Sequence, residues 1–225
     1  MRGGARTGQV DTERWREYPP CCLGLGDGFA PSRTRDVCLV GYALSRGEEV
    51  SASTVDMDGD HDAMYRQIRE KLEAGFRCVK LKIGAIGLEE ELDLLRFIRR
   101  HFPAREVELR VDANGAFAPA EALDKLKRLA EFDLHSIEQP IRAGQWDEMA
   151  GLTSVSPLPI AFDEELIGHC SLEAKRRLLD ALHPQYIVLK PSLHGGFSGC
   201  REWIEEAEKR NVGWWITSHW SRTLV

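Results

Sequence analysis

The chain has 225 residues, of which 43% are hydrophobic and 29% are charged. These proportions are typical of a folded globular protein and argue against a disordered or fibrous one. The formal net charge is −6. It argues against nucleic acid or an anionic membrane as the main partner, because either would need a basic face.

No apolar run approaches the roughly 18 residues of a membrane span, and the N-terminus lacks the hydrophobic stretch of a signal peptide. We therefore expect a cytoplasmic protein. None of the six cysteines belongs to a CxxC pair. We expect reduced thiols rather than disulfides or a zinc site.

The first 49 residues show little helical or strand periodicity, and they contain eight of the 20 glycines. We expect residues 1–49 to be an irregular, weakly structured region and residues 50–225 to form the folded domain. A weak first strand is expected near Val50–Val55.

After residue 50, helix-like stretches alternate with short runs rich in Val, Ile and Leu. The expected helices begin near Asp62, Leu88 and Pro119 and cover about 145–151, 171–182 and 199–210. The expected strands are 78–83, 107–112, 134–138, 159–163, 186–190 and 214–217. The strand ends recur about every 25–30 residues, as a (β/α) barrel requires. An open doubly wound sheet is less favoured, because no Gly-rich phosphate turn follows the first strand. The pattern predicts an α/β fold, an incomplete TIM-type barrel of about seven strands that lacks the last one.

Five successive strands of this pattern end in ionisable residues. They are Lys80 with Lys82, then Asp112, Glu138, Asp163 and Lys190. Strand ends meet at the carboxyl-terminal mouth of a barrel, so these side chains should converge there. Three carboxylates cannot all stay ionised together without a cation, and ligands that are all oxygen favour Mg²⁺ before Mn²⁺. We therefore expect Asp112, Glu138 and Asp163 to bind Mg²⁺ and to leave positions for water and a substrate carboxylate.

Lysines beside such an ion indicate proton abstraction next to a carboxylate, because the ion stabilises the charge that develops. Lys82 is the expected base. Lys80 beside it should lower the pKa of Lys82 toward neutrality by like-charge repulsion. Lys190 would face the opposite side of the substrate, either as a second acid/base or as a cation that steadies the intermediate.

These motifs together resemble the enolase superfamily, in its mandelate racemase/muconate-lactonizing branch. They are VKLKIG (79–84), RVDANGAF (110–117), IEQP (137–140), FDEEL (162–166) and LKPS (189–192). Within that branch, LKPSLHGGFSG followed by GWWITS is similar to the o-succinylbenzoate synthase family. The family also carries an N-terminal capping domain, and residues 1–49 are too short for it.

The resemblance implies a Mg²⁺-dependent lyase that dehydrates a cyclohexadiene carboxylate to o-succinylbenzoate in menaquinone synthesis. It implies that Lys82 removes the α-proton and then protonates the leaving hydroxyl, while Lys190 stabilises the enolate from the other face. It also makes Asn114, Ser192 and Ser218 candidates for contacts with the substrate or with the residues behind it.

Two other readings remain open. The chain could be an N-acylamino acid racemase or dipeptide epimerase of the same superfamily, in which Lys82 and Lys190 exchange protons on opposite faces. It could also be a truncated remnant without catalytic activity. The expected partner is a small-molecule carboxylate, and the open edges of an incomplete barrel would favour a homo-oligomer.

Overall fold

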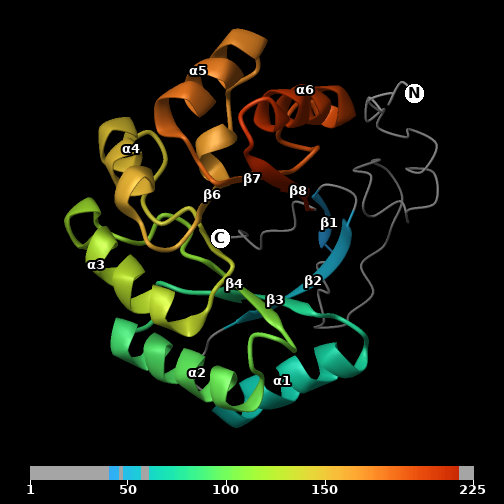
Figure 1. Cartoon of the computed structure of the whole chain (residues 1–225), viewed down its shortest axis with the longest axis vertical. Coiled ribbons are helices and arrows are strands. Elements are labelled where there is room, and N and C mark those ends of the chain that lie inside the picture. Colours follow the sequence, from blue (N-terminus) through green and yellow to red (C-terminus); the bar gives the residue numbers. More distant parts are fainter. Residues whose placement is uncertain (1–40, 46–47, 57–60, 218–225) are drawn as a thin grey trace, which may run out of the picture.

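A computed structural model describes residues 41–45, 48–56 and 61–217 of the chain, which form one sheet curled into a ring with helices outside it (Figure 1). The strands are β1 (Gly41–Ser45), β2 (Glu48–Asp56), β3 (Cys78–Lys82), β4 (Glu108–Asp112), β5 (Ser136–Glu138), β6 (Ile160–Phe162), β7 (Tyr186–Leu189) and β8 (Gly213–Ile216). The helices are α1 (His61–Glu73), α2 (Leu88–His101), α3 (Pro119–Leu129), α4 (Trp146–Val155), α5 (Leu172–Leu182) and α6 (Gly196–Glu208), with short 3-10 turns η3 (Ala130–Phe132) and η4 (Glu164–Leu166).

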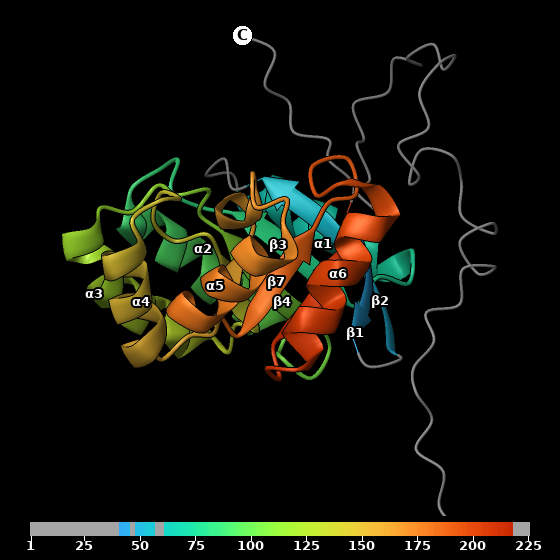
Figure 2. The same cartoon turned by 90° about the horizontal axis from the view of Figure 1, so that it is seen from above.

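The strands follow one another around the sheet in chain order, from β1 to β8. Every neighbouring pair from β2 to β8 is parallel, and most successive strands are joined by a helix that packs on the outside. Seen from above, helices α3 to α6 stand side by side along the sheet (Figure 2). The alternation confirms the predicted α/β fold, an incomplete TIM-type barrel.

The first strand corrects the sequence analysis. Residues 41–45 were placed in the irregular segment, but they form β1, which pairs antiparallel with β2 and also lies against β8. The described sheet therefore has eight strands rather than seven, with β1 beside β8. Residues 41–45 belong to the glycine-rich segment that shows no sustained periodicity, and their antiparallel pairing with β2 defines the strand. The rest of the expected irregular region, residues 1–40, lies outside the described residues, so the domain division remains a prediction there. Association through open edges also remains a prediction.

The helices largely follow their sequence signals. Pro119 is the first residue of α3, and Ser171 caps α5 by accepting a hydrogen bond from the Ala174 backbone N–H at 3.1 Å. Helix α4 extends to Val155, beyond the predicted end at 151, because its C-terminal turn packs against α5: Thr153 donates to the Leu182 carbonyl at 2.7 Å. Helix α6 begins at Gly196, three residues before the predicted start. No helix in the described part of the chain is long and apolar enough to cross a membrane.

The main core fills the space between the sheet and the helices. Val79, Leu81, Val111 and Ile137 on the strands pack there with the buried faces of the helices. The opposite face of the sheet has a much smaller apolar cluster of Ala161, Val188 and Trp215. The Arg110 guanidinium lies 4.3 Å from the Trp215 ring centroid and pairs with Glu108. The inner face therefore carries charged side chains beside this small cluster. Toward the carboxyl ends of the strands, further charged side chains follow on the same face.

An ion cluster joins the last two helices. The Glu206 carboxylate on α6 is almost fully buried and accepts hydrogen bonds from Arg176 on α5 and from Lys209 and Arg210. Hydrogen bonding to Arg176 is the largest cause that lowers the pKa of Glu206 to about 2, with Lys209 and Arg210 adding to it. Because three cations share one carboxylate, this cluster stabilises the packing of α5 against α6.

A candidate active site at the carboxyl ends of the strands

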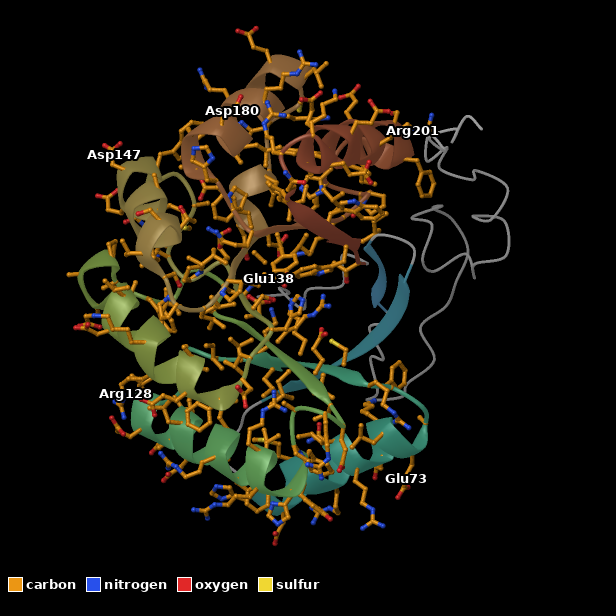
Figure 3. All side chains as sticks on the ribbon, viewed as in Figure 1. Glu73, Arg128, Glu138, Asp147, Asp180 and Arg201 are labelled. Carbon is orange, nitrogen blue, oxygen red and sulfur yellow. The ribbon has the colours of Figure 1, made fainter. Side chains whose placement is uncertain are left out.

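The strand register brings three of the predicted residues onto one level. Lys82 is the register partner of Asp112, and Asp112 is the partner of Glu138, so these residues lie side by side at the ends of β3, β4 and β5. Side chains alternate between the two faces of a strand, so Lys80 shares the inner face with Lys82. Figure 3 shows Glu138 near the centre of the ring of strands, whereas Asp147 lies on the periphery.

Lys80 lies between two buried carboxylates. Its Nζ is 2.7 Å from Asp112 Oδ2 and 2.8 Å from Glu138 Oε2. The Asp112 and Glu138 side chains are only 1% and 3% exposed. Burial by itself would lower the pKa of Lys80, but the two carboxylates outweigh it and raise that pKa above the ordinary lysine value. Lys80 is therefore a fixed positive charge deep in the site.

Lys82 lies closer to solvent and makes two contacts. Its Nζ is 2.5 Å from Asp112 Oδ2 and 2.6 Å from Asn114 Oδ1, and 39% of its side chain is exposed. The Asn114 amide Nδ2 in turn donates to Glu164 Oε1 at 2.9 Å. Lys82 is thus held at the end of β3 but remains accessible from the mouth, as an acid/base that meets a substrate must be.

The opposite side of the mouth carries the second lysine. Lys190 Nζ pairs with Asp163 Oδ2, and the Lys190 backbone N–H donates to His194 Nδ1 at 2.8 Å. Ala161 is the register partner of Glu138, and Asp163 follows two residues later. The tilt of the strands in a barrel staggers neighbouring strands in this way, so Asp163 stands at the same mouth as Glu138, whose pKa its charge helps to raise.

The three lysines balance the three carboxylates unevenly. Burial would raise the pKa of Asp112, but Lys80 and Lys82 outweigh it and lower that pKa. For Glu138, burial is the largest cause, and the charges of Asp112 and Asp163 add to it, which raises the pKa to about 8. Glu138 therefore lies where additional positive charge would be most stabilising.

The chemistry of the carboxylates fits a hard divalent cation, although their oxygens are not grouped as a complete set of ligands. Glu138 Oε1 and Asp163 Oδ1 are buried and have no hydrogen-bond partner among the described residues. Buried carboxylate oxygens of this kind need a donor or a cation, and an all-oxygen set favours Mg²⁺. In the described part of the chain, no three His, Cys, Asp or Glu side chains are grouped so that they could hold an ion as they stand. The lysines engage one oxygen of each candidate ligand, so the predicted set of Asp112, Glu138 and Asp163 remains a prediction.

Comparison with known proteins shows the family to which the chain belongs. Residues 63–224 match the model of the family described as Enolase C-terminal domain-like. The chain belongs to this family. The expected membership of the enolase superfamily is thereby confirmed.

Individual relatives of this enolase-like chain are enzymes of that superfamily. It is 53% identical to an o-succinylbenzoate synthase of Desulfotalea psychrophila over 176 residues, which cover 78% of this chain and 48% of the relative. A crystal structure of MenC from the same organism superposes with a TM-score of 0.71 at 52% identity, covering 75% of this chain and 46% of that one. An N-succinylamino acid racemase of Thermus thermophilus is 33% identical over 194 residues, covering 86% and 50%. The chain thus spans about half the length of these relatives.

Other predicted site residues of this enolase-like chain are less central. Ser192 is exposed in the turn after β7, and Ser218 lies outside the described residues.

A cavity of about 860 Å³ lies at the other end of the ring, where its lining includes Pro159, Tyr186 and Gly213. Those residues stand at or just before the starts of β6, β7 and β8, so this cavity is separate from the mouth.

Two further side chains that hydrogen-bond residues of the mouth were not singled out from the sequence. Gln139 is fully buried, and its Oε1 accepts hydrogen bonds from the Asp163 and Glu165 backbone N–H groups at 3.3 and 3.1 Å. Glu164 holds the Asn114 amide, and its Oε2 is buried without a partner among the described residues. Both lie inside quoted motifs, directly after a predicted acidic ligand. That position was the available signal, because residues next to a ligand commonly orient it.

Proposed function

We propose that this chain carries a Mg²⁺-dependent dehydratase site of the o-succinylbenzoate synthase type, acting on a small cyclohexadiene carboxylate. The observation that carries the proposal is the placement of Lys82 and Lys190 on either side of a carboxylate cluster, in a chain 53% identical to an o-succinylbenzoate synthase. A role in menaquinone synthesis and a cytoplasmic location follow from the same likeness and belong to the proposal.

In this proposal, Lys82 performs both proton transfers. Its Nζ removes the proton α to the substrate carboxylate, and the same Nζ then gives that proton to the hydroxyl that leaves. The carbon–oxygen bond breaks, water departs, and the ring becomes the aromatic ring of o-succinylbenzoate. Because one amine serves both steps, the proton and the hydroxyl leave from the same face of the ring.

The other charged residues support this transfer. Lys190 places a positive charge on the opposite face, where it stabilises the electron-rich intermediate. Lys80 keeps Asp112 and Glu138 together on the inner face through its two short contacts. Asp112, Glu138 and Asp163 would hold Mg²⁺. When bound, that ion supplies electrostatic stabilisation of the charge that develops on the substrate carboxylate.

The test is a dehydration assay on the full chain with Mg²⁺ titrated from zero to millimolar concentrations. We expect turnover that requires Mg²⁺ and that falls by about 10³-fold or more in Lys82→Ala, since the base is removed. Lys127→Ala is the matched control, because Lys127 is 58% exposed and lies on helix α3, outside the ring of strands and away from the mouth. Turnover that persists in Lys82→Ala, or a wild-type chain that stays inactive at every Mg²⁺ concentration, would contradict the proposal.

A second candidate is an N-acylamino acid racemase, which the 33% identity to an N-succinylamino acid racemase favours. Lys82 and Lys190 would then exchange protons on opposite faces of one carbon. Incubation of an N-succinylamino acid in deuterium oxide distinguishes the two reactions. Incorporation of deuterium at the α-carbon without any dehydration of the cyclohexadiene substrate would favour the racemase.

A further inference from the structure

The side chains of Lys82, Asn114 and Glu164 form a continuous hydrogen-bonded chain across the mouth. Lys82 Nζ contacts Asn114 Oδ1 at 2.6 Å, and Asn114 Nδ2 donates to Glu164 Oε1 at 2.9 Å. Lys82 is the last residue of β3, whereas Asn114 and Glu164 follow β4 and β6. The chain therefore ties the proposed base to a carboxylate that lies 82 positions further along in the sequence.

Glu164 determines which way the Asn114 amide points. A carboxylate only accepts hydrogen bonds, so it must face the NH₂ end of the amide. The amide oxygen is then turned toward Lys82, which can only donate. The Asn114 backbone is fixed as well: its φ is +44°, in the left-handed region that asparagine tolerates, and its N–H donates to Asp112 Oδ1 at 3.0 Å. The Asn114 side chain is consequently held from both ends.

This arrangement sets the direction of the reactive position on Lys82. A neutral amine has two N–H groups and one lone pair in a roughly tetrahedral arrangement. Asp112 Oδ2 at 2.5 Å and Asn114 Oδ1 at 2.6 Å accept the two N–H groups. The lone pair is left to point away from both acceptors. In the protonated amine, the third N–H occupies that same direction, ready for the leaving hydroxyl.

We propose that Asn114 and Glu164 are positioning residues for the proton transfers at Lys82. This inference rests on the proposed function, because it assigns Lys82 the acid/base role. It adds that the amide and the carboxylate behind it aim Nζ. A small error in such alignment costs up to about 100-fold in rate without loss of binding.

The first test compares kinetic constants. We expect Asn114→Leu and Glu164→Leu to lower kcat by about 10- to 100-fold while KM changes little. Glu164→Gln should restore most of kcat, because its amide oxygen can still accept from Asn114. The Asn114→Leu/Glu164→Leu double variant should be no slower than Asn114→Leu alone, since both changes break one chain.

The matched control is Asn211→Leu. Asn211 also has a left-handed backbone, with φ of +57°, but it precedes β8 at the opposite end of the ring. Its substitution should lower the thermal midpoint about as much as Asn114→Leu does, while kcat stays unchanged. An equal fall of kcat in Asn211→Leu would show that backbone strain, rather than the aim of Lys82, explains the loss, and would overturn the inference.

A second readout does not depend on turnover. In protein labelled with ¹⁵N-lysine, the Nζ signal of Lys82, assigned by its loss in Lys82→Arg, should show slow exchange with water in the wild type and in Glu164→Gln. It should exchange fast in Asn114→Leu and in Glu164→Leu. An inactive wild type with this pattern would refute the proposed function and leave the positioning intact. An Nζ signal that does not respond to either leucine substitution would overturn the positioning itself. A Glu164→Gln variant whose Mg²⁺ affinity falls together with kcat would also overturn it, because Glu164 would then act as a ligand of the ion.

Discussion

Replacing Lys80 by methionine tests whether the lysines balance the buried carboxylates. The substitution keeps the length and much of the volume of the side chain but removes the ammonium group that contacts Asp112 at 2.7 Å and Glu138 at 2.8 Å. Removing one partner of a buried ion pair costs about 3–5 kcal/mol, because the remaining charge is left unpaired in a poorly solvated place. Because the pKa of Glu138 is raised to about 8, that carboxyl is largely protonated at pH 7, and less negative charge is left unpaired than in a fully ionised pair; the expected loss is therefore about 3 kcal/mol, at the lower end of that range. The free energy of unfolding of a typical domain is about 5–15 kcal/mol, so this loss is a large fraction of it.

Urea unfolding at pH 7 without divalent ions measures this loss through tryptophan fluorescence. Lys127→Met is the control, because the Lys127–Asp124 pair lies on the surface at 3.2 Å and such pairs contribute about 1 kcal/mol or less. Adding Mg²⁺ should then stabilise Lys80→Met more than it stabilises the wild type, since the ammonium that contacts both carboxylates is gone and only Lys82, at Asp112, still competes with the ion. An ion present at 100 times its Kd raises the free energy of unfolding by about 2.7 kcal/mol.

Two results would refute this reasoning. If Lys80→Met unfolds within about 1 kcal/mol of Lys127→Met, the contacts of Lys80 do not balance the buried charge. If Mg²⁺ stabilises the wild type and Lys80→Met equally, then Lys80 and the ion do not share the carboxylates Asp112 and Glu138.

Three further predictions concern the scaffold. The pKa of Glu206 is lowered to about 2, so its ionised form contributes stability that is complete above about pH 4.5 and is lost as the pH falls through 2. In Glu206→Gln, the thermal midpoint should therefore fall less steeply than in the wild type when the pH is lowered from 5 to 2. Gly199→Ala should lower stability by about 3 kcal/mol or more in urea titrations, because the new Cβ would lie 1.7 Å from the His194 carbonyl oxygen, and a loss below about 1 kcal/mol would contradict the packing. Thr153→Val should cost about 1 kcal/mol by removing the hydrogen bond to the Leu182 carbonyl, whereas a stabilised variant would show that the bond contributes nothing.

Much of the ring could be predicted because its signals are local. Strands and helices alternate with distinct periods, and a residue at a strand end can be assigned to the mouth before any contact is known. The strand β1 could not be predicted in this way. It stands outside the repeat of parallel strands and helices, and it is defined by antiparallel pairing with β2 and by its place against β8. The extension of α4 past Gly151 has the same origin, because packing against α5 outweighs the low helix propensity of glycine.

The contacts of the site were less predictable than its residues. Lys80, Lys82, Asp112 and Glu138 were assigned to one end of the ring from sequence, and the structure brings them together there. The link between Asn114 and Glu164 spans 50 positions and depends on how two loops close over the strand ends. No local pattern encodes that closure, because it follows from the relative register of β4 and β6.

The register of the strands connects the hydrophobic pattern with the chemistry. Val79 and Leu81 are fully buried on the helix side of β3, and their neighbours in the sequence are the lysines of the inner face. A slip of one residue between β3 and β4 would set Val111 instead of Asp112 beside Lys82 and would turn an apolar side chain inward. The free energy gained by burying the apolar face against the helices therefore also holds the lysines and carboxylates in line. Substitutions that weaken that apolar face should disturb the arrangement of charges at the mouth before they unfold the ring.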